Sequence, residues 1–384
     1  MTDERTLRTA DAATACGADW AILTAPDAVY YAAQVDSIIE TGPSPFAGGP
    51  ALAIVGRDGS LAVVVNNLDE AAARASAADH VTVYQGIDLR DRTLVESRFR
   101  GAMREALSAL GVGGTVAVQA ASFPWTLGEM LTSQGVAIVD IDAELNQRRC
   151  IKTPEEIERL RWCAHLTDLG QAAALRGARP GRSELELWAE VRLAIEAAEG
   201  QRVPVAGDLT SGIDSTAAIT GWPTDRVIGD GDPILCDLAP RARGYWGDSC
   251  NTIVVGEPPA GFDALYRASV EAVQTAIEYL RPGITGGDLD ATMRAVFDRH
   301  GVVDPTHMGH AIGTGVHEWP RIVPGETARI REGMVLMLEP GAYAPGVGGV
   351  RLEWMYLVTA SGNEVLSGFP HAQSPVTATA AREA

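Results

Sequence analysis

The chain has 384 residues, enough for two domains, and its apolar fraction of 46% and charged fraction of 21% are typical of a globular protein. A formal charge of −19 argues against sequence-independent binding to nucleic acid or to anionic membranes, which require a basic surface. The first residues contain no signal-like apolar core and no apolar run reaches spanning length, so we expect a cytoplasmic protein.

Strand-like and helical segments alternate from about Trp20 to Asp142. The expected strands are WAILTAP, ALAIVGRDGSLAVVVN, VTVYQG, GTVAVQ and GVAIVDI, and the expected helices are LDEAAARASAA and LVESRFRGAMREALSALG. This alternation predicts an α/β N-terminal domain of residues 1–148. The next domain, residues 149–384, begins near a helix start at which Thr153 and Glu156 have capping-box spacing.

The second domain contains an internal repeat. The segment RPGRSELELWAEVRLAIEAAEG resembles the later segment RPGITGGDLDATMRAVFDRHG, and each is followed by a stretch that ends in a β-hairpin. Asp237 lies 57 residues after Pro180, and Glu339 lies 57 residues after Pro282. Helical and hairpin segments in two similar halves predict an α+β domain.

The first hairpin is PILCDLAPRARGYWGDSCNTIVVG. We place its turn at Ala242 and Arg243, which makes Asp237 and Asp248 equidistant from the turn and directly opposite each other. Like charges at roughly 5 Å in an effective dielectric near 20 repel by about 3 kcal/mol. A chain that places two carboxylates there requires a compensating positive charge.

The second hairpin, MVLMLEPGAYAPGVGGVRLEWMYLVT, has the same property. Its turn is near Gly346, from which Glu339 and Glu353 are equidistant. Four converging carboxylates cannot remain ionised without cations, and this number can hold two divalent ions about 3.5–4 Å apart. Such clusters usually include an imidazole, and the segment HMGHAIGTGVHEWPRIVPG between the hairpins provides three histidines, of which His310 and His317 are flanked by glycine-rich sequence.

These residues together resemble the pita-bread metallohydrolases, the family of methionine aminopeptidase, prolidase, aminopeptidase P and creatinase. The resemblance covers nearly the whole chain, because TAPDAVYYAAQ resembles the creatinase-type N-terminal domain and KTPEEIERLRWCAHLTD resembles the helix that opens the catalytic domain. It implies a pseudo-twofold catalytic domain and a homodimer. It also implies a binuclear site of manganese, cobalt, iron or zinc, with manganese expected first. The residues that match the family's metal ligands are Asp237, Asp248, His310, Glu339 and Glu353.

The resemblance also implies catalytic roles. Glu339 would accept a proton and pass it to the leaving amine, and His317 would donate a hydrogen bond to the developing oxyanion. Arg351 lies two residues before Glu353 and should share its face of the strand, where it would orient a metal carboxylate or hold a substrate carboxylate. We expect His307 to line the pocket, although relatives often carry this histidine one residue earlier.

One departure from the family affects the substrate. In ITGWPTDRVIGDGD, Thr220 stands where peptide-cleaving relatives usually have a substrate-contacting histidine, while the neighbouring PTDR residues are intact. Thr220 and the large rings of Trp222 and Trp319, which lie in loop-like sequence, are therefore expected substrate contacts.

Three functions remain open. The leading interpretation is a metal-dependent hydrolase of an amide bond, of the Xaa-Pro dipeptidase or aminopeptidase P kind, acting on a small peptide. The alternative, favoured by Thr220, is a pita-bread enzyme that acts on a non-peptide small-molecule amide. A non-catalytic binding protein that kept the fold is disfavoured, because it would have no reason to retain five costly ligands.

Overall fold

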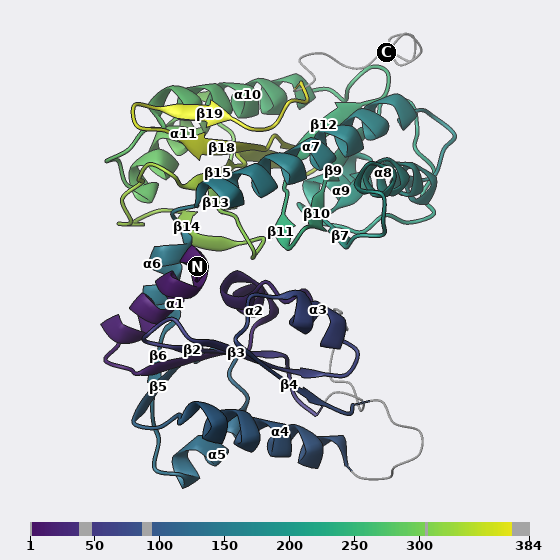
Figure 1. The fold of residues 1–384 in the computed structure, drawn as a ribbon. Coiled ribbons are helices and arrows are strands. Elements are labelled where there is room, and N and C mark those ends of the chain that lie inside the picture. The colour runs from purple at the N-terminus through teal and green to yellow at the C-terminus, as the bar shows by residue number, and fades with distance from the viewer. Residues whose placement is uncertain (1, 38–47, 87–93, 304–305, 371–384) are drawn as a thin grey trace. The chain divides into compact units, whose positions relative to one another are not determined.

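The computed structural model describes residues 2–37, 48–86, 94–303 and 306–370 (Figure 1). The chain forms two compact units, Met1–Arg149 and Cys150–Ala384, whereas the sequence analysis placed the boundary after residue 148. Among the helices in these stretches, none has both the length and the apolar character needed to cross a bilayer.

The N-terminal unit contains one six-stranded sheet. Its strands are β1 (Trp20–Leu23), β2 (Leu52–Gly56), β3 (Leu61–Asn66), β4 (His80–Tyr84), β5 (Thr115–Val118) and β6 (Ala137–Asp140). The strand order is β4-β3-β2-β1-β5-β6, and β1 pairs antiparallel with β2 and parallel with β5. Five of the six strands lie within the apolar runs predicted from the sequence, and β4 begins one residue before its run, at His80.

Helices cover both faces of this sheet. They are α1 (Glu4–Ala15), α2 (Pro26–Ala33), α3 (Glu70–Ala75), α4 (Val95–Leu110), α5 (Trp125–Ser133) and α6 (Asp142–Arg149). One apolar cluster joins the sheet to α1 and α2, and a second joins the opposite face to α4 and α5. The predicted helices correspond to α3 and α4, and the three layers form the α/β domain predicted from the sequence.

The described part of the C-terminal unit has four long helices and one short one. They are α7 (Pro154–Gly177), α8 (Glu184–Glu199), the short α9 (Ile213–Ala217), α10 (Phe262–Tyr279) and α11 (Gly286–His300). The predicted capping box at the start of α7 is present, since Thr153 accepts from the amide of Glu156 and the Glu156 side chain accepts from the amide of Thr153.

The strands of this unit form four small sheets. They are β7 (Val205–Ala206), β8 (Leu209–Ser211), β9 (Pro233–Asp237), β10 (Ala239–Ala242), β11 (Tyr245–Trp246), β12 (Cys250–Val254), β13 (Gly309–Ala311), β14 (Glu318–Ile322), β15 (Val335–Leu338), β16 (Gly341–Ala344), β17 (Gly348–Arg351), β18 (Trp354–Val358) and β19 (Asn363–Val365). The strand orders are β11-β10-β7, β12-β9-β8, β14-β13-β15-β18-β19 and β16-β17.

The internal repeat is visible in the structure as matching local contacts. Ser183 caps α8 and forms an isolated bridge with Val227, and Thr285 caps α11 and forms a bridge with Arg329. Each member of the second bridge lies 102 positions after its counterpart (183 to 285 and 227 to 329). The same offset relates Asp237 to Glu339, so the two halves present these acids at equivalent places.

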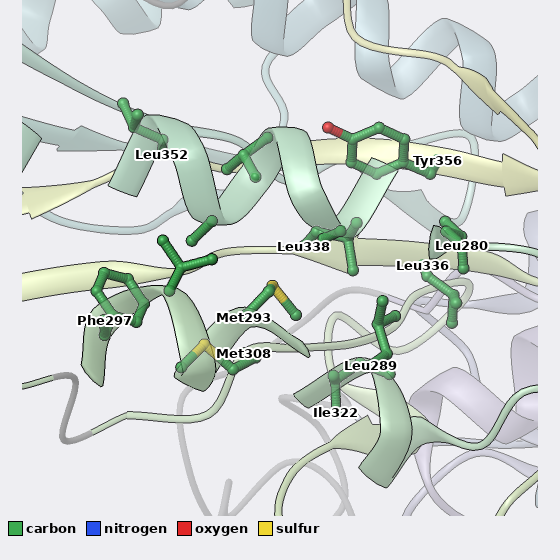
Figure 2. Packing of buried hydrophobic residues seen from close by; sticks show 14 of the residues in the cluster. Leu280, Leu289, Met293, Phe297, Met308, Ile322, Leu336, Leu338, Leu352 and Tyr356 are labelled. Carbon is green, nitrogen blue, oxygen red and sulfur yellow. The ribbon is translucent and has the colours of Figure 1, made fainter. Parts of the chain in front are cut away.

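The second half of the C-terminal unit is built on a continuous apolar core. Figure 2 shows Met293 of α11 directed toward the strand that carries Leu338, with Leu289 and Ile322 close together below it. These side chains are fully buried, and each such burial contributes roughly 1.5–3 kcal/mol. This core fixes β15 and β18, the first and last strands of the second acid hairpin.

Candidate metal centre

The first acid hairpin runs from β9 to β12. Its tight turn is at Arg243 and Gly244, whose φ angles of 52° and 80° are those of a two-residue type I′ turn. Asp237 is therefore paired with Cys250. The prediction that Asp237 lies directly opposite Asp248 was wrong by one position in the turn, because a type I′ turn needs positive φ at both central residues and Gly244 supplies one of them. The two acids are diagonal neighbours on one face of the hairpin.

The second acid hairpin has the predicted register. The β15–β18 and β16–β17 ladders share a single register centred on Gly346, in which Glu339 and Glu353 are opposite each other. The two hairpins meet where Cys250 and Glu353 exchange backbone hydrogen bonds of 3.3 and 2.9 Å. This contact brings the acids of both halves of the repeat to one place.

His310 enters the cluster from β13. Its Nδ1 lies 2.9 Å from the carbonyl oxygen of Ala311 and donates to it, which leaves Nε2 as the acceptor that faces the carboxylates. The preceding residue, Gly309, has φ of 153°, and a Cβ there would be 2.0 Å from the carbonyl oxygen of Met337. The strand can therefore carry His310 to this depth only because residue 309 has no side chain.

Gly309→Ala is expected to destabilise the protein by about 2 kcal/mol, because the added methyl group displaces β13 from β15. It is also expected to weaken divalent-metal binding, since His310 moves with the strand. Urea unfolding and manganese titration would measure both effects. Gly362→Ala, which adds a methyl group into open space, is the matched control and should stay within about 0.5 kcal/mol of the parent protein. A Gly309→Ala protein as stable as this control would contradict the steric argument.

Three carboxylate side chains converge on the His310 ring. Its Nε2 lies 3.4 Å from Oε1 of Glu339, 3.7 Å from Oδ2 of Asp248 and 4.0 Å from Oε1 of Glu353. Two ligand atoms that share an ion at about 2.1 Å each are at most about 4.2 Å apart. The ligand atoms of Asp248, His310 and Glu353 all lie within 4.8 Å of one another, which is close to this limit.

Burial and crowding make the ionised cluster unfavourable without a cation. Burial, and after it the carboxylate of Glu353, raises the pKa of Asp248 well above its ordinary value. Burial, and after it the carboxylate of Glu339, does the same to the pKa of Glu353. Burial lowers the pKa of His310 to about 3 and keeps the imidazole neutral, as a metal ligand must be.

Arg351 binds the first acid of the cluster. Its Nη2 donates to Oδ2 of Asp237 at 2.5 Å and to Oδ2 of Asp208 at 3.1 Å, and its Nη1 donates to the carbonyl oxygen of Ile219 at 3.2 Å. The side chain of Arg351 is 6% exposed, so these contacts are well shielded. Asp208 was missed by the sequence analysis because it lies outside both hairpins, where the only local signal is the glycine that precedes it.

The two remaining histidines of the segment lie beside His310. The ring centroid of His317 is 4.5 Å from that of His310, and His317 is exposed to solvent. The ring of His307 is 5.7 Å from that of His310, and its Nδ1 is 3.4 Å from Oε1 of Glu339. The structure thus groups all three predicted histidines around one edge of the acid cluster.

The expected substrate contacts occupy different environments. Thr220 is exposed and follows Ile219, whose carbonyl oxygen is bonded to Arg351. Trp222 is 83% exposed, which is unusual for a large ring. Trp319 on β14 packs partly against the apolar core of the second half.

The donor set fits a divalent metal ion. Oxygen ligands with one neutral imidazole suit several divalent ions, and the buried Oε2 of Glu353 has no hydrogen-bond partner among the described residues. A cation there would satisfy this oxygen and offset the repulsion among the acids. The fold and this cluster together define a metal-dependent enzyme.

Comparison with known proteins gives the family. The sequence profile of metallopeptidase family M24 matches residues 158–360, and that of the creatinase/prolidase N-terminal domain matches residues 5–151. The chain belongs to metallopeptidase family M24 and is a metal-dependent hydrolase of amide bonds.

Relatives and solved structures extend over both units. The chain is 30% identical over 345 residues to the Xaa-Pro dipeptidase of Pyrococcus horikoshii, covering 89% of this chain and 92% of that one. The prolidase structure from the same organism superposes with a TM-score of 0.81 at 25% identity and covers 97% of this chain and 100% of that one. The dipeptidase PepE structure from Mycobacterium ulcerans gives 0.80 at 26% identity, with 97% of each chain covered. The predicted fold class, an α/β domain followed by a pita-bread α+β domain, is confirmed.

Proposed function

We propose that this protein is an Xaa-Pro peptidase that hydrolyses proline-containing dipeptides and short peptides. The observation that carries the proposal is the convergence of three carboxylates on the Nε2 of His310, at 3.4, 3.7 and 4.0 Å. The names of relatives such as the Xaa-Pro dipeptidases of Pyrococcus horikoshii and Pyrococcus furiosus support the substrate class. These relatives favour a peptide over the non-peptide amide that the threonine at position 220 suggested.

The residues that would hold the metal are those of the two hairpins and β13. We assign two divalent ions, manganese before cobalt, iron or zinc, to Asp237, Asp248, His310, Glu339 and Glu353. When bound, the ions would activate a water molecule and polarise the scissile carbonyl group. Two ions with four carboxylates and one imidazole also neutralise the cluster, which explains why the acids can share a buried site.

The other side chains would orient the reactants and move protons. Glu339, whose Oε1 is 3.4 Å from both His307 and His310, accepts the proton of the attacking water and delivers it to the leaving amine. His317, exposed beside the cluster, donates a hydrogen bond to the carbonyl oxygen as negative charge develops there. Arg351 holds Asp237 in its ligand orientation through the 2.5 Å contact, and His307 lines the pocket.

Trp222 would form a wall of the substrate pocket. Trp222→Ala is expected to raise KM about 5-fold on an Xaa-Pro substrate with little change in kcat, since a ring contact of this kind contributes about 1 kcal/mol. The stability should change little, because the ring is 83% exposed. Steady-state kinetics and a thermal melt measure the two quantities. Trp125→Ala, which removes a 78% exposed ring from the N-terminal unit, is the control, and equal KM values for the two variants would remove Trp222 from the pocket.

A substrate panel tests the proposed function directly. Manganese-loaded enzyme should hydrolyse Xaa-Pro dipeptides or Xaa-Pro-Xaa tripeptides at roughly 1–10³ per second, and Ala-Ala peptides of the same lengths should be poor substrates. Glu339→Gln enzyme serves as the blank. A metal-loaded protein that turns over none of the panel would contradict the Xaa-Pro assignment and return the non-peptide amides to consideration.

The family resemblance also supports a homodimer, which we include in the proposal. Sedimentation velocity at several protein concentrations should give a single species of twice the chain mass of 40.5 kDa. A species of 40.5 kDa throughout would exclude the dimer.

A further inference from the structure

Asp208 closes a ring of interactions around the metal ligand Asp237. The backbone carbonyl of Asp208 accepts the amide of Asp237 at 2.8 Å. Its side chain accepts from Arg351 at 3.1 Å, and the same Arg351 nitrogen donates to the side chain of Asp237 at 2.5 Å. Asp237 is thus held through its backbone by Asp208 and through its carboxylate by the residue that Asp208 holds.

The close approach of the two segments depends on the preceding residue. Gly207 has φ of 118°, and a Cβ there would lie 2.2 Å from the carbonyl oxygen of Asp237. A residue with a side chain could occupy this position only if the two segments moved apart. The chain therefore brings Asp208 alongside the metal ligand at a place where the backbone has no spare room.

The same carboxylate also binds the loop of residues 219–221, which we call the Thr220 loop. The other oxygen of Asp208, Oδ1, accepts the amide of Gly221 at 3.1 Å, and Leu209 donates its amide to the carbonyl oxygen of Gly221 at 3.2 Å. Ile219, with an unusual φ of 78°, accepts a hydrogen bond from Arg351 on its carbonyl oxygen at 3.2 Å. Thr220 therefore lies between one residue bonded to Arg351 and another bonded to Asp208.

We propose that Asp208 is a positioning residue of the active site, which fixes the metal ligand Asp237 through Arg351 and fixes the Thr220 loop through Gly221. This inference rests on the proposed role of Asp237 in metal binding. A carboxylate suits both tasks, because one oxygen forms a charge-assisted bond to the guanidinium while the other accepts a backbone amide. Its side chain is 15% exposed, so solvent screens the pair only partly.

Two substitutions separate the two links. Asp208→Asn retains an oxygen for the amide of Gly221 but loses the charge that attracts Arg351, so we expect metal affinity to fall about 10–100-fold with KM nearly unchanged. Asp208→Ala removes both links, so we expect the same loss of metal affinity together with a higher KM. Manganese affinity is measured by calorimetric titration of metal-free protein, and KM is measured at saturating manganese.

Controls distinguish positioning from general stability. Asp298→Asn removes one negative charge from the exposed surface of α11 and should leave the manganese affinity unchanged. An Asp208→Asn protein that melts at a lower temperature but binds manganese as tightly as the parent protein would overturn the inference. A parent protein that binds no divalent metal would instead overturn the proposed function itself.

A double mutant provides a second test that does not depend on one variant. Arg351→Lys keeps the positive charge but loses the planar guanidinium, whose Nη2 contacts both acids and whose Nη1 contacts Ile219. If the two residues act as one unit, Asp208→Asn combined with Arg351→Lys should weaken manganese binding little more than the stronger single change does. Losses that add fully in free energy would show that Asp208 acts independently of Arg351 and would contradict the proposal.

Discussion

Glu339→Gln is expected to lower kcat/KM on an Xaa-Pro substrate by about 10³-fold while the protein stays folded. Glutamine has the shape of glutamate but cannot accept the proton of the attacking water or pass it to the leaving amine. It is also a weaker metal ligand, because it carries no charge. The position is 8% exposed and lies 3.4 Å from Nε2 of His310, so bulk water cannot easily replace the missing carboxylate.

The same substitution should not destabilise the metal-free protein. The carboxylate of Glu339 raises the pKa of Glu353 through repulsion, second only to burial. Removing that charge relieves the crowding, so the melting temperature of the metal-free variant should equal or exceed that of the parent protein. Glu332→Gln, an exposed acid outside the cluster, is the control for activity. A Glu339→Gln enzyme with more than about a tenth of the parent activity would contradict the proton-transfer role.

The sequence predicted the acid hairpins because strand pairing follows simple counting rules. The register of the second hairpin is correct, since Gly346 provides an unambiguous centre for the Glu339–Glu353 pair. The first register is one residue off, because two central positions were compatible with the apolar pattern and only the positive φ of Arg243 and Gly244 selects between them. The predicted register placed Asp248 on the correct face of the hairpin but opposite the wrong residue.

The sequence could not predict contacts that depend on where distant segments meet. Asp208 reaches Arg351 across 143 positions of sequence, and no periodic pattern links the two residues. The exchange of hydrogen bonds between Cys250 and Glu353 likewise joins strands of different halves of the repeat. Short-range rules determine local registers, whereas such pairings arise from the packing of the whole unit.

The internal repeat made the acids of the metal centre easier to predict than the substrate contacts. Each half supplies an acid at an equivalent position, so one hairpin indicates where to look in the other. The segment around Thr220 has no such counterpart, and Thr220 was recognised only as a departure from relatives. The positive φ of Ile219 and the bonds on either side of Thr220 are visible only in three dimensions.

Removing the divalent metal is expected to lower the free energy of unfolding by about 4 kcal/mol, compared with protein that holds metal at 1,000 times its dissociation constant. The ions bind the folded cluster and not the unfolded chain, so the stabilisation follows from mass action. Thermal melts of chelator-treated and manganese-loaded protein measure the difference. Magnesium at the same concentration is the control ion. It prefers octahedral, partly hydrated sites, so it should bind more weakly to this imidazole-containing cluster.

The free energy of unfolding that is lost on metal removal should grow as pH rises above about 6.5. Asp248 and Glu353 have raised pKa values in the metal-free fold, so their contribution to stability is present below their unfolded pKa values of about 4 and is lost as pH rises through the raised ones. His310, with its pKa lowered to about 3, acts in the opposite direction but only below its unfolded value of about 6.5. Above pH 6.5, where His310 no longer titrates in either state, the carboxylates should therefore lower the melting temperature of the metal-free protein as pH rises toward their raised pKa values. Glu353→Gln should flatten this slope, and a metal-free parent protein that becomes more stable across the same range would show that the acids are already compensated within the protein.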